Sequence, residues 1–191
     1  MNWYRLHHTI GMHLVFSAQK RADYIRKHDL FRHMGKNCMV MFRKMPLYPK
    51  LISVGDNVWI ASNVLLITHD VIHRVINNCT EDTHLSEYMG CIDIKDNVFI
   101  GAGTMVLPNV TIGPNSIIAA GSVVNKSLPG NGVYGGTPAK YICSFDALVE
   151  KRKAISDIEI VKNKRKDLSE KTVEQLWDRF NKKEEKVIIN G

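Results

Sequence analysis

The segment IKDNVFIGAGTMVLPNVTIGPNSIIAAGSVV, residues 94–124, carries an aliphatic residue at every sixth position. Residues such as Pro, Gly, Asp and Asn recur two and three positions after each aliphatic residue. They favour turns, because Pro presets φ and Gly, Asp and Asn tolerate positive φ. Only three or four residues remain for a strand between turns. The period therefore predicts a chain that coils around a prism, an all-β solenoid of short parallel strands. The aliphatic positions are Ile94, Ile100, Val106, Ile112, Ile118 and Val124.

The same period runs upstream through Val54, Ile60 and Leu66, and more weakly through Met34 and Val40. Because side chains alternate across a strand, the residue two places before each aliphatic position shares its inward side. Small or β-branched residues dominate this inward set, and they suit a narrow interior. The set comprises Val58, Ile60, Val64, Leu66, Val98, Ile100, Thr104, Val106, Val110, Ile112, Ser116, Ile118, Ser122 and Val124.

The outward positions predict self-association. Residues 18 apart stack on one outer face, which pairs Phe99 with Ile117 and Met105 with Val123, whereas Thr111 falls on the third face. Two apolar outer faces are poorly placed in water, so we expect a face of each prism to pack on a different face of its neighbour. A three-sided prism favours a homotrimer.

The chain of 191 residues, 45% of them hydrophobic, suits one globular domain with appendages. The apolar spacing of residues 9–27 indicates a helix, and a second helix is expected to begin near Ser169 and to continue past Trp177. Both helical ends are expected to cover terminal coils. The expected divisions are an N-terminal helical cap at 1–33, a β-helix at 34–145 with a loop at 70–93, and a C-terminal helical extension at 146–191.

The net charge of +7 is unevenly distributed. Residues 1–50 carry +8, residues 51–145 carry −3 and residues 146–191 carry +2. Because the prism is acidic and no nucleic-acid-binding module is present, we expect no nucleic-acid partner. The basic N-terminal segment is expected near an anionic acceptor or a peripheral membrane surface, with an ordinary solvated face as the alternative.

The location of the protein is expected to be cytoplasmic. No apolar run reaches the roughly 18 residues of a membrane span, and residues 10–16 lack the pattern of a signal sequence. The cysteines lack the paired spacing of metal sites, and in a reducing compartment we expect free thiols. They are Cys38, Cys79, Cys91 and Cys143.

The repeat breaks between Leu66 and Ile94, which lie 28 positions apart instead of a multiple of six. Loops inserted in a regular scaffold often carry function. This one places His69 and His73 directly after a strand. An imidazole titrates near neutral pH and can therefore act as a general base.

In these features the segment 54–142 resembles the hexapeptide-repeat acyltransferases, with galactoside, maltose and polysaccharide O-acetyltransferases as the nearest relatives. The resemblance implies a left-handed parallel β-helix, a handedness that the period alone does not give. It rests on Gly55-Asp56-Asn57-Val58-Trp59-Ile60, Thr68-His69 with His73, Gly121-Ser122-Val123-Val124 and Gly136-Thr137-Pro138-Ala139-Lys140.

The resemblance also implies a mechanism and a cofactor. Acetyl-CoA would lie in the cleft between adjacent subunits, and His69 would accept the proton of an acceptor hydroxyl, with Asp70 or Glu87 orienting the imidazole. The thioester is already activated, so no metal is expected. The implied cofactor-binding residues are Gly101, Ala102, Ala119, Ala120, Gly121 and the phosphate-contacting Lys126 and Lys140.

One departure concerns the acceptor. Where the sugar acetyltransferases have an Asn that contacts the acceptor, this chain has Met41, and its short N-terminal helix is basic instead of long and acidic. A sugar in a surface-polysaccharide or glycan pathway is therefore expected in place of a free galactoside or maltose. We assign acceptor contacts to His73, Met41 and Glu87, and a plain solvated role remains open for His73.

Three alternatives stay open at this point. A zinc enzyme similar to the γ-carbonic anhydrases would use His69, His73 and His84 as ligands. An antibiotic acetyltransferase would share the same motifs. A non-catalytic hexapeptide scaffold would only assemble partners.

Overall fold

The computed structural model describes residues 3–153 and 168–189. Contacts divide the chain into two compact units, Met1–Leu148 and Val149–Gly191. The first unit holds the prism and the N-terminal helices. Residues 154–167 of the expected C-terminal extension lie outside the described residues.

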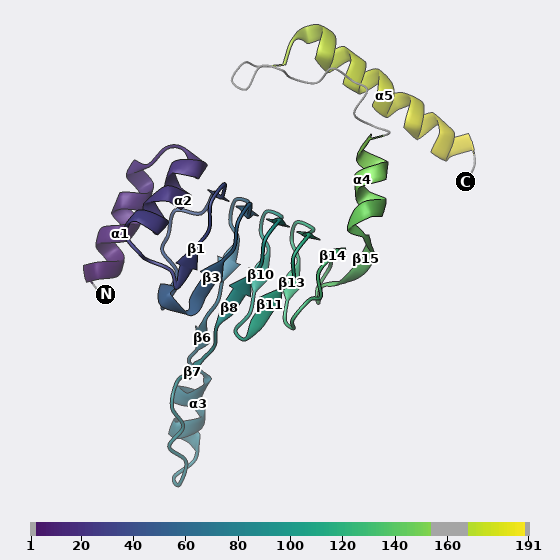
Figure 1. Cartoon of the computed structure of the whole chain (residues 1–191). Coiled ribbons are helices and arrows are strands. Elements are labelled where there is room, and N and C mark those ends of the chain that lie inside the picture. Colours follow the sequence, from purple (N-terminus) through teal and green to yellow (C-terminus); the bar gives the residue numbers. More distant parts are fainter. Residues whose placement is uncertain (1–2, 154–167, 190–191) are drawn as a thin grey trace. The chain divides into compact units, whose positions relative to one another are not determined.

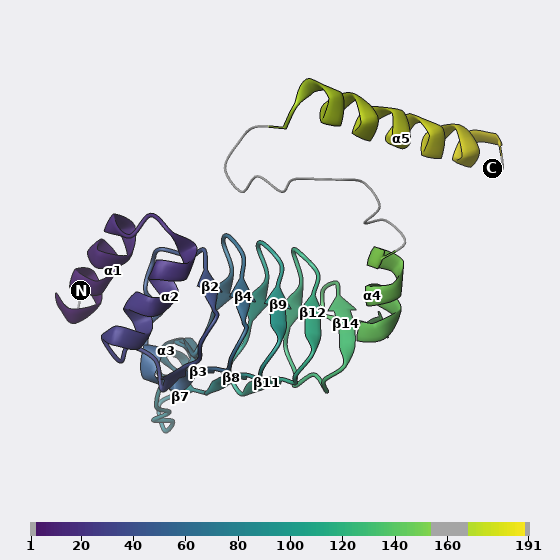
Figure 2. The ribbon, with the colours of Figure 1, turned by 45° about the horizontal axis from the view of Figure 1, so that its top comes forward.

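Parallel strands from successive coils form the three sides of the prism (Figure 2). The first sheet joins β1 (His33–Met34), β3 (Ile52–Val54), β8 (Ile92–Ile94) and β11 (Val110–Ile112). The second joins β5 (Leu65–Leu66), β10 (Met105–Val106) and β13 (Val123–Val124). The third joins β2 (Met39–Val40), β4 (Trp59–Ile60), β9 (Val98–Ile100), β12 (Ser116–Ile118), β14 (Gly132–Gly135) and the antiparallel β15 (Lys140–Ser144).

The interior of the prism follows the predicted alternation. Every residue of the inward set is buried, and the most exposed of them, Leu66, shows only 6% of its surface. Thr104, Ser116 and Ser122 place hydroxyls inside, and each donates a hydrogen bond to a main-chain carbonyl. The polar members of the set are thus satisfied without water, as a narrow core requires.

The strand register confirms the predicted outer faces. Phe99 lies opposite Ile117 on the third sheet, and Met105 lies opposite Val123 on the second. On the first sheet Thr111 lies opposite Asp93, so that face is polar. Two adjacent sides of the prism are therefore apolar.

One corner of the prism is built by a ladder of asparagines. Asn57, Asn97, Asn115 and Asn131 all adopt left-handed backbone angles, with φ between 53° and 59°. Their side-chain amides hydrogen-bond from coil to coil at 2.8–3.0 Å. Asn suits this position because it tolerates positive φ and carries both a donor and an acceptor.

This ladder yields a stability prediction. Asn97→Ala removes two hydrogen bonds and places alanine in the left-handed region, which alanine tolerates less well than asparagine. We therefore expect the free energy of unfolding to fall by about 1–3 kcal/mol. Asn97→Gly removes the same bonds without the conformational cost and should lose clearly less. Urea denaturation of both variants measures the two values, and equal losses would show that the backbone conformation contributes nothing.

Two helices precede the first coil: α1 (Trp3–Leu14) and α2 (Ala18–Lys27). The expectation of one helix over residues 9–27 is wrong, because the chain turns at Ser17, whose hydroxyl accepts a hydrogen bond from the Lys20 amide as the N-cap of α2. Helix α2 packs against β1 and β2 at the start of the prism (Figure 1).

At the opposite end of the prism, a strand lies between the last coil and the C-terminal helices. The last parallel strand, β14, is covered by the antiparallel strand β15, which departs from the six-residue period and leads into α4 (Phe145–Lys153). The second unit contains α5 (Glu170–Ile189), which begins after Ser169 as an N-cap: the Ser169 hydroxyl accepts a hydrogen bond from the Thr172 amide. None of the described helices is long and apolar enough to span a bilayer.

The break in the repeat is an arm that projects from the prism (Figure 1). The sequence predicts a loop at residues 70–93, whereas the structure shows β6 (His69–Asp70), α3 (Ile72–Cys79) and β7 (Tyr88–Met89), with β6 and β7 antiparallel. At its base Asn109 donates a hydrogen bond to the Tyr88 hydroxyl at 2.7 Å. The short 3-10 turn η1 (Pro49–Leu51) lies upstream, before β3.

Candidate functional site

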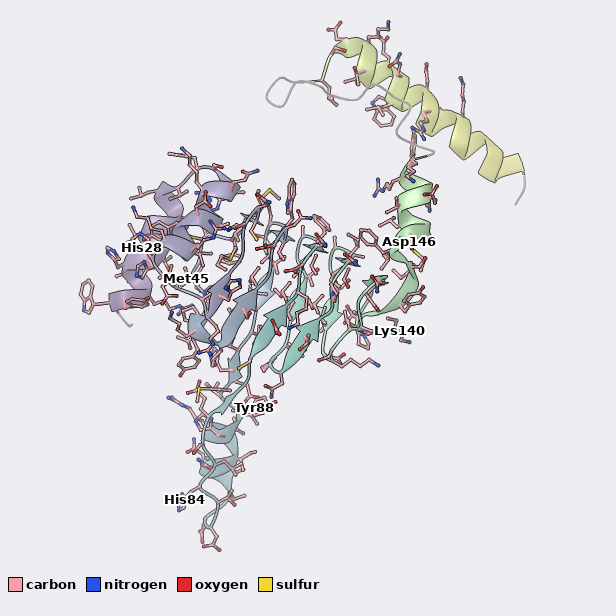
Figure 3. The ribbon with its side chains drawn as sticks, in the orientation of Figure 1. His28, Met45, His84, Tyr88, Lys140 and Asp146 are labelled. Atoms are coloured by element: carbon pink, nitrogen blue, oxygen red, sulfur yellow. The ribbon has the colours of Figure 1, made fainter. Side chains whose placement is uncertain are left out.

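A cavity of about 660 Å³ lies where the N-terminal helices meet the prism. Helices α1 and α2 contribute basic residues to it, and the segments 41–47 and 62–67 supply most of the wall. His69 completes the lining at the root of the arm. We refer to this cavity as the cleft; Met45, one of its lining residues, is labelled in Figure 3.

His69 occupies a fixed position in the cleft. It lies on β6, opposite Met89 of β7, and is half-buried. The Tyr48 ring contacts it edge to face, with ring centroids 5.4 Å apart. Its Nδ1 atom is buried and has no hydrogen-bond partner among the described residues. A partly exposed imidazole with one buried nitrogen presents the other, Nε2, for proton transfer.

Tyr48 was not anticipated from the sequence. Its backbone is in the left-handed region, with φ 52° and ψ 55°, which is costly for a bulky residue and often marks a functional site. Its hydroxyl donates a 3.0 Å hydrogen bond to the Glu87 carboxylate, and this bond raises the pKa of Tyr48. No sequence motif signals this pairing, since 39 positions separate the two residues.

The carboxylates proposed to orient His69 are engaged elsewhere. Asp70 accepts a hydrogen bond from the Ile72 amide at 3.0 Å, and Glu87 accepts the one from Tyr48. Because the His69 Nδ1 has no partner, the expected orienting hydrogen bond is not formed within residues 3–153 and 168–189. Glu87 reaches His69 only indirectly, through the Tyr48 ring.

The expected acceptor contacts are not all in one place. Met41 lines the cleft together with His69 and is 38% exposed. His73 lies on α3 and Glu87 lies just before β7, and neither lines the cleft. The Nδ1 atom of His73 is also buried without a partner in the described part of the chain.

The expected cofactor residues stack along one edge of the prism that begins at the cleft. The Gly103 amide donates to the carbonyl of Ser62, a cleft residue, at 2.9 Å, and the Gly121 amide donates to the Ala102 carbonyl at 2.8 Å. Ala102, Ala120 and Gly121 are exposed along this edge, which offers main-chain groups to an elongated ligand.

Gly101 is required for the close stacking of these coils. A Cβ at this position would lie 2.7 Å from the Ala120 Cα and 2.8 Å from the Ala119 carbonyl carbon. Lys126 and Lys140 are both exposed. Lys140 lies at the end of the prism opposite the N-terminal helices (Figure 3).

A zinc site of three histidines has no geometric support in the described residues. They contain no group of three or more His, Cys, Asp or Glu side chains arranged to hold a metal ion. His84 is exposed and lies far along the arm from its base (Figure 3).

Comparison with known proteins agrees with the fold. Residues 92–126 match the family described as bacterial transferase hexapeptide (six repeats). Over 111 residues, 58% of this chain, the sequence is 38% identical to galactoside O-acetyltransferase from Escherichia coli K12, a match that covers 52% of that protein. Over 144 residues it is 31% identical to galactoside O-acetyltransferase from Lactococcus lactis, covering 65% of this chain and 67% of the relative.

The chain belongs to the hexapeptide-repeat acyltransferases. The structure of maltose O-acetyltransferase from Clostridium difficile 630 superposes with a TM-score of 0.52 at 27% identity, covering 73% of this chain and 85% of that one. The left-handed winding of the prism follows from this membership. This hexapeptide-repeat acyltransferase spans about half the length of the E. coli relative.

Proposed function

We propose that this hexapeptide-repeat acyltransferase transfers an acetyl group from acetyl-CoA to a sugar hydroxyl. The observation that carries the proposal is His69, which lines a cleft whose residue Ser62 stacks beneath the edge of small residues at Gly101–Ala102 and Ala119–Gly121. Several relatives are named as sugar O-acetyltransferases, in agreement with this chemistry.

In the proposed step, the His69 imidazole accepts the proton of the acceptor hydroxyl as the oxygen attacks the thioester carbonyl carbon. The new carbon–oxygen bond forms and the carbon–sulfur bond breaks. The proton then passes from the imidazolium to the departing CoA sulfur, so that the enzyme is unchanged. We assign the base to Nε2 because Nδ1 is buried. Tyr48, held by Glu87, packs against the ring and limits its rotation.

The edge of small residues suits the pantetheine arm. Exposed main-chain groups at Ala102 and Ala120 can hydrogen-bond to its amides, and the absence of large side chains lets it approach closely. The proposed contacts for the phosphates of CoA are two exposed cations: Lys126, which follows β13, and Lys140, at the far end of the prism (Figure 3).

We propose a homotrimer, with active sites at subunit interfaces. The two apolar sides of the prism leave large side chains in water: Trp59 is 43% exposed, Phe99 38%, Leu65 50% and Met105 40%. Packing the side with Trp59 and Phe99 on the side with Leu65 and Met105 of the next subunit would bury both, and repetition of that contact closes a ring.

This assembly has a direct test. Phe99→Glu places a charge in the centre of the proposed interface and should shift the protein to monomers at micromolar concentration, with loss of acetyl transfer. Thr111→Glu, an outward substitution on the polar side, should leave the trimer intact. Light scattering gives both masses. A monomeric wild-type protein, or a Phe99→Glu variant that stays trimeric, would contradict the proposed interface.

We propose that the acceptor belongs to a surface polysaccharide or related glycan and that the reaction takes place in the cytoplasm. A screen of sugars with acetyl-CoA, followed by a thiol reagent, tests the reaction. CoA release that requires one class of sugar supports the proposal. The absence of release with every sugar, at concentrations that saturate the relatives, would argue for a non-catalytic role.

A further inference from the structure

The cleft carries an unbalanced positive charge. Arg5, Arg21, Arg43 and Lys44 line it together with His13 and His69, and no Asp or Glu is among its lining residues. In the part of the chain that the structure describes, none of the four cations forms an ion pair with a carboxylate. Elsewhere in the N-terminal segment cations are paired, as Arg26 is with Asp23 and Lys50 with Asp29.

Arg21 is the most unusual of these cations, because only 2% of its surface is exposed. A buried guanidinium is costly unless it is paired with an opposite charge. Its Nε donates to the Val40 carbonyl at 2.8 Å, and its Nη1 donates to the carbonyls of Val15 and Phe16. Its Nη2 contacts only the Met41 sulfur, at 3.8 Å, a weak acceptor.

The other two arginines are held in the same way. Arg43 donates to the His13 carbonyl at 2.9 Å, and Arg5 donates through Nε to the Met45 carbonyl at 2.9 Å. Main-chain carbonyls thus fix the directions of three guanidinium groups and leave their charges unneutralised. Burial and the neighbouring Arg43 both lower the pKa of Arg21, as expected where like charges are gathered.

We propose that this cluster binds an anionic group of the acceptor, a carboxylate or phosphate carried on the sugar, beside the hydroxyl presented to His69. The inference rests on the proposed function and narrows its substrate class to acidic sugars. Arg43 uses only Nη1 in its contact with the His13 carbonyl, so its remaining N–H donors can bind carboxylate or phosphate oxygens, and Arg21 contributes its charge and the weakly engaged Nη2 beside them. Met41, which contacts Arg21 and lines the cleft with His69, places the cluster next to the reaction site.

Matched acceptors test this proposal. Methyl glycosides of neutral hexoses are compared with the corresponding uronic acids and with the hexose 1-phosphates, at fixed acetyl-CoA, by CoA release. We expect at least one anionic sugar to have a kcat/KM about 10- to 100-fold above its neutral partner, the range of a hydrogen bond to a charged group. The uronic acids and the phosphates separate the two sources of charge. Equal values within every set would overturn the inference while leaving the proposed function intact.

Variants show whether the cluster contributes to binding of the acceptor or to binding of acetyl-CoA. Arg43→Gln should raise KM for the anionic sugar about tenfold and leave KM for acetyl-CoA unchanged, the size expected for one lost charged hydrogen bond. Arg21→Lys, checked by its melting curve because of its burial, should act in the same direction. Lys20→Gln, an exposed charge loss one residue away on α2, should have no effect. A rise confined to KM for acetyl-CoA would instead assign the cluster to CoA phosphates and overturn the inference.

Calorimetric titration of the wild-type protein with glucuronate and with methyl glucoside gives a readout that needs no turnover. Binding of glucuronate alone, weakened in Arg43→Gln, is the expected result. If no sugar is acetylated but this binding is seen, the proposed reaction fails and the anion site stands. If glucuronate, glucose 1-phosphate and methyl glucoside bind alike, the anion site fails.

Discussion

Replacing His69 with alanine is expected to lower kcat for acetyl transfer about 100- to 10,000-fold, the usual contribution of a positioned general base. The His69 imidazole lines the cleft, and among the described histidines only His13, on α1, lines it as well. Because the deleted ring is half-buried at the root of an arm, the prism should fold and assemble normally. KM for acetyl-CoA should change little.

Two further histidines serve as controls for that measurement. His84→Ala, in the exposed part of the arm, should keep full turnover. His73→Ala tests the acceptor contact assigned to it: a higher KM for the sugar with unchanged kcat supports that role. Steady-state CoA release measures turnover of all three variants, and light scattering measures their assembly. Wild-type turnover in His69→Ala would contradict the assignment of His69 as the general base.

Gly101→Ala is expected to destabilise the protein strongly for a substitution that adds a single methyl group. The new Cβ would meet the main chain of Ala119 and Ala120 at 2.7–2.8 Å, and backbone atoms cannot move aside as a flexible side chain can. The coils must separate locally, with a loss of about 3 kcal/mol, the upper range for overpacked sites. The same separation displaces the exposed amides assigned to the pantetheine arm, so KM for acetyl-CoA should rise as well.

Gly103→Ala is the matched control for Gly101→Ala. Gly103 has φ +71°, but a Cβ there would meet no atom within 4 Å. The expected loss is therefore only about 1 kcal/mol, the cost of a left-handed alanine. Thermal unfolding compares the two variants. A loss for Gly101→Ala no larger than that for Gly103→Ala would show that close contact between the coils does not explain the glycine at position 101.

The prism could be predicted from sequence because its physics is local and repeated. In a strand of three residues followed by a corner, the side chains alternate between the interior and the outside in only one way. Ile100 and Ile118, for example, occupy equivalent inward positions in successive coils. The six-residue period therefore determined which side chains are buried and which, such as Phe99, face outward. The break in that period singled out His69, whereas its position in the lining of the cleft comes from the structure.

The parts that could not be predicted depend on contacts between distant, non-repeating segments. The hydrogen bond from Tyr48 to Glu87 joins two irregular segments, and the burial of Arg21 depends on where α2 packs on β2. Nothing in the sequence distinguishes Arg21 from the other basic residues of the N-terminal segment. The sequence predicts a loop at residues 70–93 only because the six-residue period breaks there, and that period carries no information about the helix α3, which buries none of its own residues.

The most direct test of acetyl transfer follows the acetyl group itself. Wild-type protein is incubated with deuterated acetyl-CoA and the acceptor found in the screen, and mass spectrometry is applied to the sugar and to the protein. The account predicts one deuterated acetyl ester on the sugar for each CoA released, and no label on the protein at any time. CoA release without a labelled sugar, or a labelled protein that precedes it, would contradict direct transfer assisted by His69.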